Sequence, residues 1–180
     1  LSLHDGLPMW YLWGDRVQAS YNEDEVKKSA IERILKHIDE NYLQEDVILL
    51  KEFMQFYYQG MSAEDLNNRD VHSLYGALVS HWQLFCGRKP QEYAIKVFNP
   101  DFEDHGWQAS RTVIEIAIDN MPFVLSSLRI LLTRFDYDIY LIVGVPEILV
   151  ARNKNNKVTS ISSKKIKSNT KANEETVVYI

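Results

Sequence analysis

The hydrophobic residues in the first half of the chain recur at helical spacing. Between residues 22 and 41 apolar side chains return every three or four positions, with charged residues between them, as on one face of an amphipathic helix. This stripe consists of Val26, Ala30, Ile31, Ile34, Leu35, Ile38 and Tyr42. Asn22 followed by Glu25 is typical of a capping box, so the pattern predicts a helix over residues 22–41.

Three further helical stretches precede residue 90. They are bounded by Asp46 and Gly60, by Ser62 and Leu66, and by Asp70 and Gly87. Ser and Asp are good helix caps, and a glycine followed closely by a proline is typical of a helix end. We therefore expect residues 22–90 to form a helical layer, preceded by an irregular leader over residues 1–21.

After Pro90 the hydrophobic period changes from that of helices to that of strands. The run 93–100 is strand-like, and in 113–119 three isoleucines alternate with Glu115, Ala117 and Asp119. Alternation of this kind predicts a half-buried strand with one face packed on a helix. The partner is expected to be a helix over 121–135, with Pro122 in its first turn, where a missing N–H costs nothing.

The remaining segments predict more strands. A run rich in β-branched residues covers 138–150, and Gly144 with Pro146 indicates a bend or bulge inside it. A turn is expected at 153–157, followed by a strand that pairs back as a hairpin. The last residues, 175–180, start one more strand, which we expect at the edge of the sheet. The polar segment 163–173 between them is expected to be mobile. A start without Met and an end within a strand suggest a fragment of a longer polypeptide.

Composition narrows the class of protein. The chain has 180 residues and a formal net charge of -5, which argues against nucleic acid as the main partner, because phosphate binding needs a surplus of Lys and Arg. No stretch approaches the roughly 20 apolar residues of a membrane helix, so no membrane partner is expected. Cys86 is the single cysteine and cannot form an internal disulfide, so a cytoplasmic location is the simplest interpretation.

The sequence contains no motif that would hold a dinucleotide, a phosphate or a metal in the familiar ways. The five histidines are scattered, and Cys86 lies beside an apolar stripe, as a small buried hydrophobe does. The acidic residues at 101–104, next to His105, fit a turn better than a cation site. The lysines between 154 and 171 fit a solvated loop better than a contact with an acidic partner. No catalytic residue and no metal site is therefore predicted.

One junction is a candidate for ligand binding. The predicted strand 113–119 runs into the predicted helix through Asp119, Asn120, Met121, Pro122 and Phe123. Free N–H groups at a helix start attract anions such as the carboxylate of an amino acid, while Asn120 could equally cap those groups itself. Both interpretations stay open, and the candidate ligand contacts are Asp119, Asn120, Met121 and Phe123.

Several blocks between Phe53 and Arg152 resemble the N-terminal region of the very large bacterial NAD-specific glutamate dehydrogenases. The blocks are Phe56–Leu66, Arg88–Pro90, Val97–Pro100, Gly106–Gln108, Thr112–Ile116 and Asn120–Phe123. The family commonly has two acidic residues before Met-Pro-Phe, where this chain has Asp119 and Asn120. The blocks keep their order and spacing, which makes the resemblance more specific than any single motif.

The resemblance implies a regulatory region. In that family the N-terminal part looks like ACT-type domains, small ferredoxin-like units that often bind amino acids. The expected fold is therefore α+β, with an N-terminal helical layer over 22–90 and an ACT-like antiparallel sheet with a packed helix over 91–180. The glutamate and NAD sites of the parent enzyme lie downstream, so this chain is expected to hold no cofactor and to catalyse nothing alone.

Three functions follow as hypotheses. The first is a non-catalytic module that senses an amino-acid effector and couples it to a downstream catalytic domain of the same chain. The second is an architectural module that helps to form a homo-oligomer and binds no small molecule. The third, an independent enzyme, is disfavoured because no nucleophile, metal cluster or phosphate loop is recognisable.

Overall fold

The N-terminal half of the chain is helical, as its periodicity predicts, in a computed structural model that describes residues 9–163 and 172–180. The helices are α1 (Met9–Asn41), α2 (Val47–Gln59), α3 (Ala63–Asn67) and α4 (Val71–Gly87). Two predicted caps are confirmed: the Ser62 hydroxyl accepts a hydrogen bond from Asp65 N at 3.0 Å, and the Asp70 carboxylate accepts one from Ser73 N at 2.9 Å. Each cap satisfies an N–H group that its helix leaves unpaired.

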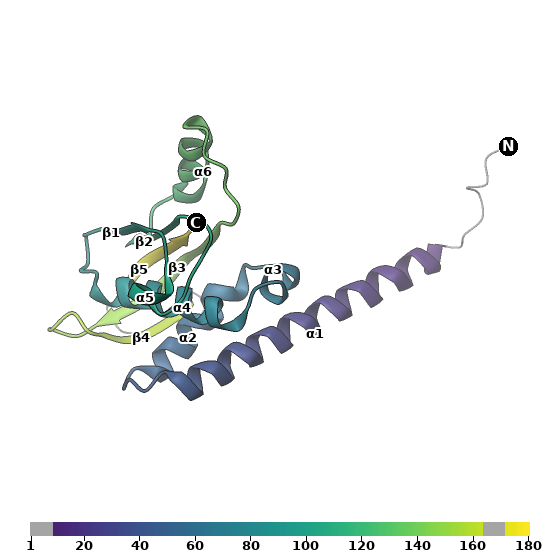
Figure 1. Cartoon of the computed structure of the whole chain (residues 1–180), viewed down its shortest axis with the longest axis horizontal. Helices are drawn as coiled ribbons and strands as arrows, with labels where there is room; N and C mark the ends of the chain where they lie inside the picture. Colours follow the sequence, from purple (N-terminus) through teal and green to yellow (C-terminus); the bar gives the residue numbers. More distant parts are fainter. Residues whose placement is uncertain (1–8, 164–171) are drawn as a thin grey trace.

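Helix α1 begins earlier than the sequence pattern predicts. We expected an irregular leader over 1–21 and a capping box at Asn22, but α1 is helical from Met9 onwards. No proline follows Pro8 within the helix, and Gly14, its single glycine, costs only about 1 kcal/mol relative to alanine. The N-terminal part of α1 projects away from the remaining elements (Figure 1).

The second half forms a five-stranded sheet in the order β1-β2-β5-β3-β4. The strands are β1 (Ala94–Phe98), β2 (Val113–Asp119), β3 (Val143–Arg152), β4 (Val158–Ser163) and β5 (Asn173–Tyr179). Every neighbouring pair is antiparallel, so β2 and β3 run parallel with β5 between them. Helix α6 (Val124–Arg134) connects these two strands, which makes a split βαβ unit.

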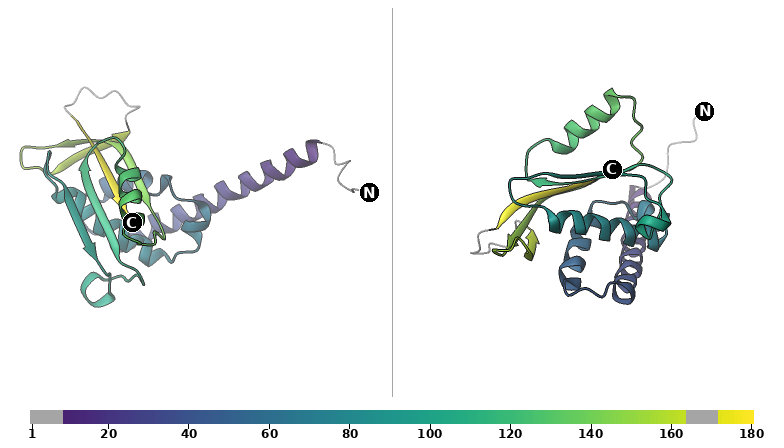
Figure 2. Two further views of the ribbon diagram at one scale, coloured as in Figure 1. Left: turned by 90° about the horizontal axis from the view of Figure 1, so that it is seen from above. Right: turned by 60° about the vertical axis from the view of Figure 1, so that its left-hand side comes forward.

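Helices cover both faces of the sheet (Figure 2). On one face α2 and α4 pack against the strands, and residues of α1, α2, α4 and the sheet share one hydrophobic core. On the other face α6 lies over Ile116, Ile118 and Val178. Gly144 of β3 permits this approach, because a Cβ atom there would lie 2.4 Å from a methyl carbon of Leu125.

Strand β2 is buried on both faces, whereas the alternation predicted a half-buried strand. The isoleucine face packs toward α6, as expected. The opposite face, which carries Glu115 and Ala117, is buried as well, and both residues are fully inaccessible to solvent. Alternation of apolar and polar residues predicts an exposed face wherever a glutamate occurs. It therefore could not indicate that helices also cover the face that carries Glu115.

Four further predictions about the second half have outcomes. The bulge near Gly144 and Pro146 is confirmed, because the β3–β5 register shifts between Val145 and Ile148, and the hairpin of β3 and β4 is confirmed too. Helix α6 begins at Val124 rather than 121, because Phe123 adopts a left-handed backbone with φ of 65°. Strand β5 is the central strand, not an edge. Most of the segment expected to be mobile, residues 164–171, lies outside the described residues.

The fold is α+β, with a helical N-terminal part and an ACT-like antiparallel sheet. One-turn helix α5 (Phe102–His105) occupies the acidic stretch after β1, and Asp101 caps it by accepting a hydrogen bond from Asp104 N at 2.8 Å. Among the described residues, no helix has the length and apolar character needed to span a bilayer.

Candidate functional site

The predicted junction between β2 and α6 uses its polar side chains for internal contacts. The Asp119 carboxylate forms an ion pair with Arg88 and accepts a hydrogen bond from Gln91 N at 3.1 Å. The side chain of Asn120 is also engaged: its Nδ2 donates to Glu174 Oε2 at 3.2 Å, and its Oδ1 accepts from the Thr176 hydroxyl at 2.9 Å. The two residues therefore tie β2 to β5 and to the end of α4.

The exposed part of the junction is apolar. The Met121 and Phe123 side chains are 54% and 78% exposed, and no side chain caps the first turn of α6. Asn120 does not cap that turn, because its hydrogen bonds go to β5. The four residues do lie together at one end of β2, and their role as ligand contacts stays a prediction.

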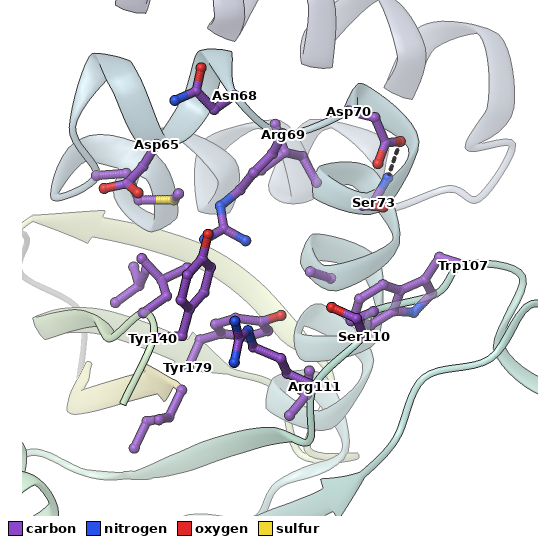
Figure 3. Close-up of a pocket in the computed structure, with 18 of the residues that line it drawn as sticks. Asp65, Asn68, Arg69, Asp70, Ser73, Trp107, Ser110, Arg111, Tyr140 and Tyr179 are labelled. Atoms are coloured by element: carbon purple, nitrogen blue, oxygen red, sulfur yellow. Dashed lines mark hydrogen bonds between the residues drawn. The ribbon is translucent and has the colours of Figure 1, made fainter. Parts of the chain in front are cut away.

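A cavity of about 860 Å³ lies at the other end of β2 (Figure 3). It is lined by three segments that are distant in the sequence: the α3–α4 connection, the loop 107–112 before β2, and the loop 137–141 before β3. The C-terminal end of β5 contributes Tyr179 to the wall. The size is within the range typical of small-molecule sites.

Two arginines meet around one tyrosine in this cavity. The guanidinium carbon of Arg111 lies 4.2 Å from the centre of the Tyr140 ring, and that of Arg69 lies 5.5 Å from it. Figure 3 shows the two side chains entering from different elements and pointing toward Tyr140. Each contact is a cation–π interaction. Together the two contacts place two positive charges on one wall of the cavity.

The described part of the chain does not neutralise either arginine. Within residues 9–163 and 172–180, no carboxylate lies within 4.0 Å of either guanidinium, and neither group makes a hydrogen bond. In the same residues, the Nε atom of Arg69 is buried without a partner. A buried donor without an acceptor is costly, so this atom requires an explanation.

The tyrosines of the wall are neutral hydrogen-bonding groups. Burial raises the pKa of Tyr57 and of Tyr58 well above 10, and it raises the pKa of Tyr179 to about 12. The Tyr58 hydroxyl donates to Leu74 O at 2.6 Å. The phenols are therefore protonated near neutral pH and add no negative charge to the cavity.

Acidic residues line the cavity as well, but two of them have structural roles. Asp70 caps α4, and its hydrogen bond with Ser73 lowers the pKa of its carboxyl. Asp65 accepts a hydrogen bond from the Ser62 hydroxyl at 2.8 Å. Glu64 and Asp138 are exposed, so the remaining negative charge lies at the solvent side.

Two titratable groups elsewhere in the core, His81 and Cys86, are kept uncharged by burial. His81 is fully buried, with Nε2 3.0 Å from Ile116 O and Nδ1 3.1 Å from the Tyr57 hydroxyl, and burial lowers its pKa to about 4. Burial raises the pKa of the Cys86 thiol to about 12, so the reactive thiolate is scarce at neutral pH. Among the described residues, no group of three or more metal-ligating side chains is found.

Glu115 is the most perturbed carboxyl outside the cavity. Its side chain is fully buried, and burial raises its pKa to about 7. The Ser80 hydroxyl donates to its Oε2 atom at 3.0 Å, and Lys96 donates to Ser80 at 3.1 Å. Its Oε1 atom is buried and has no partner in the part of the chain that the structure describes.

The sequence analysis did not single out Arg69, Arg111 or Tyr140. Each residue lies in a connection within three positions of the next helix or strand: Arg69 before α4, Arg111 before β2 and Tyr140 before β3. None of the three belongs to a motif or to a periodic pattern, so the sequence gives no signal that distinguishes them. Their convergence arises only when α4 packs across the sheet.

Comparison with known proteins assigns most of this chain to one family model. A model described as the ACT1 domain of glutamate dehydrogenase matches residues 53–180. An NAD-specific glutamate dehydrogenase of Halomonas elongata is 35% identical over 107 residues, which cover 59% of this chain and 6% of the relative. One of Pseudomonas aeruginosa is 28% identical over 107 residues, with the same coverage. The matched region is thus a small part of these relatives, and no solved structure matches the chain.

Proposed function

The chain belongs to the family of the glutamate dehydrogenase ACT1 domain, and on this premise we propose that it is a non-catalytic N-terminal regulatory module of an NAD-specific glutamate dehydrogenase. The observation that carries the proposal is the family match over residues 53–180, which the two relatives support by their names. In the parent protein, L-glutamate, NAD⁺ and water would yield 2-oxoglutarate, ammonium, NADH and a proton. The catalytic domain would lie downstream in the same chain, in the cytoplasm.

The described residues do not fit NAD. Dinucleotide sites of the familiar kind use a glycine-rich turn between a strand and a helix, so that the backbone can approach the pyrophosphate. Here the β2–α6 turn carries the bulky residues Met121 and Phe123 and no glycine. NAD is therefore assigned to other parts of the parent enzyme.

The proposed mechanism is coupling between an effector and the catalytic domain. An amino acid that binds one conformation better than another shifts the equilibrium between them, typically by about 1 to 3 kcal/mol. The proposed contacts are Asp119, Asn120, Met121 and Phe123. Support comes from the ion pair of Asp119 with Arg88, because a change at this junction would reach both the sheet and the helical layer.

Thermal unfolding of the 180-residue chain with each of the common amino acids tests this proposal. An effector that binds only the folded chain raises the midpoint, by the equivalent of about 2.7 kcal/mol at a hundredfold excess over its Kd. The change Asn120→Ala or Phe123→Ala should abolish the shift. Phe135→Ala is the matched control, since Phe135 is also exposed but lies at the other end of α6. No shift with any amino acid would refute the sensing role for this chain.

The second candidate is an architectural module that forms a homo-oligomer without a ligand. It is favoured by the exposed apolar side chains of edge strand β1 and of α6 with the residue before it, among them Ile95, Val97, Phe123 and Ile130. Exposed edges and apolar patches of this kind commonly pair with other chains. Sedimentation that depends on protein concentration, without stabilisation by any amino acid, would favour this function over the first.

A further inference from the structure

We infer that the cavity around Arg69, Arg111 and Tyr140 binds a small organic carboxylate. This site goes beyond the proposed function, because it is separate from the predicted junction. The cavity lies at the first residue of β2, and the junction begins at its last, Asp119. Seven residues at about 3.3 Å each place the two sites about 20 Å apart. Either site could therefore be occupied without the other.

The first argument is the buried Nε atom of Arg69. This atom has no hydrogen-bond partner among the described residues, in a cavity that three protonated tyrosines, Tyr57, Tyr58 and Tyr179, also line. A charged donor in such surroundings loses its hydration without compensation. An anion bound in the cavity would supply the missing acceptor.

The second argument is the position of Arg111. Its guanidinium carbon lies 4.2 Å from the centre of the Tyr140 ring, and within the described residues no acceptor takes up its N–H donors. These donors stay available in the fork arrangement that matches the two oxygens of a carboxylate. Tyr140 thus preorganises Arg111 and holds Arg69 on the same ring, which lowers the entropic cost of binding.

The third argument concerns the class of anion. The exposed carboxylates of Glu64 and Asp138 also line the cavity, so a phosphate, which concentrates its charge on one compact group, meets repulsion at the entrance. A dicarboxylate carries its two charges on separate groups, one for each of the two guanidinium groups around Tyr140. The same two acids could accept an ammonium group, so a plain dicarboxylate and an amino acid are separate arms of the test.

Isothermal titration calorimetry on the 180-residue chain tests the inference, with malonate, L-glutamate, inorganic phosphate and propane-1,3-diol as probes. Binding of malonate or L-glutamate is expected, and the neutral diol should not bind. Tighter binding of L-glutamate than of malonate would identify the ligand as an amino acid, and the reverse as a plain carboxylate. Either result supports the site.

Variants locate the binding. Arg111→Gln should raise the Kd about tenfold or more, the loss expected for a charge-assisted hydrogen bond, and Arg69→Gln should raise it similarly. Arg129→Gln, which changes an exposed arginine of α6 outside the cavity, should leave the Kd unchanged. Because Arg111 is exposed, its variant is expected to fold even if the Arg69 variant does not, and circular dichroism checks both.

Three results would overturn the inference. The first is the absence of binding by both carboxylates, and the second is phosphate binding more tightly than either of them. The third is a Kd that is insensitive to Arg111→Gln but raised by Asn120→Ala, since this would assign the ligand to the junction instead. Loss of binding in Arg111→Gln with normal binding in Asn120→Ala would support the cavity even if the junction binds nothing.

Discussion

Arg88, the residue after the end of α4, forms an ion pair with Asp119, the last residue of β2. Arg88 Nη1 also lies 3.1 Å from Glu175 Oε2 in β5, and the same oxygen lies 3.0 Å from Arg152 Nη2 in β3. Arg152 in turn donates to the carbonyl of Phe85 at 2.9 Å, at the end of α4. One network of charges therefore joins the last turn of α4 to three strands.

The first prediction concerns the centre of this network. Glu175→Gln removes the carboxylate that two buried arginines share, and breaking a buried ion pair typically costs about 3 to 5 kcal/mol. We expect the free energy of unfolding in urea to fall by about 3 kcal/mol. Glu103→Gln, at an exposed position of α5, is the control and should change little. A loss below about 1 kcal/mol in Glu175→Gln would show that the network contributes specificity rather than stability.

The second prediction concerns pH. Burial lowers the pKa of His81 to about 4. Between pH 4 and pH 6.5 the unfolded chain therefore binds a proton at this histidine that the folded chain does not. The stability contributed by neutral His81 is present above pH 6.5 and is lost as the pH falls toward 4. Burial raises the pKa of Glu115 to about 7, so its contribution is present below pH 4.5 and is lost as the pH rises to 7. Each shift is equivalent to about 3 kcal/mol. The two slopes oppose each other between pH 4.5 and pH 6.5.

Glu115→Gln should expose the slope that His81 produces. In this variant the free energy of unfolding is expected to rise with pH between 4 and 6.5 more steeply than in the unchanged chain. Above pH 7 the variant should be more stable, by up to about 3 kcal/mol. Urea unfolding at a series of pH values measures both effects. Parallel curves for the two proteins would contradict the raised pKa of Glu115.

The third prediction concerns the contact of α4 with the loop before β2. A Cβ atom at Gly76 would lie 2.2 Å from Trp107 Cγ, whereas one at Gly60 would meet nothing within 4 Å. Gly76→Ala should therefore destabilise the chain by about 1 to 3 kcal/mol, the usual cost of overpacking, although alanine favours helices. Gly60→Ala is the matched control and should be neutral or slightly stabilising. Equal effects of the two changes on the midpoint of thermal unfolding would argue against this packing.

The fourth prediction concerns the start of α6. Phe123 has a φ of 65° and a side chain that is 78% exposed, so its backbone is strained and its ring contributes little packing. Phe123→Gly should raise the free energy of unfolding by about 1 kcal/mol, because glycine adopts this conformation without penalty. Phe123→Ala keeps the strain and should not be stabilised. If both variants lose stability equally, the ring of Phe123 has a packing role.

Much of the architecture was predictable because its causes are local. The spacing of apolar residues sets the ranges of α2 and α4, Ser62 and Asp70 cap the helices that follow them, and Gly144 with Pro146 accompanies the bulge of β3. The family resemblance was also recognisable, because short blocks of residues recur in order along the chain. Each of these features depends on neighbours within a few positions, which a linear pattern records.

The tertiary structure alone decided which distant residues meet. Strand β5 occupies the centre of the sheet, Glu115 is buried under α4, and Asp119 pairs with Arg88. Arg69, Arg111 and Tyr140 come together only because α4 and two loops close over the same end of the sheet. Hydrophobic periodicity indicates which face of an element is covered, but not by which partner, because burial in water is favourable without being directional.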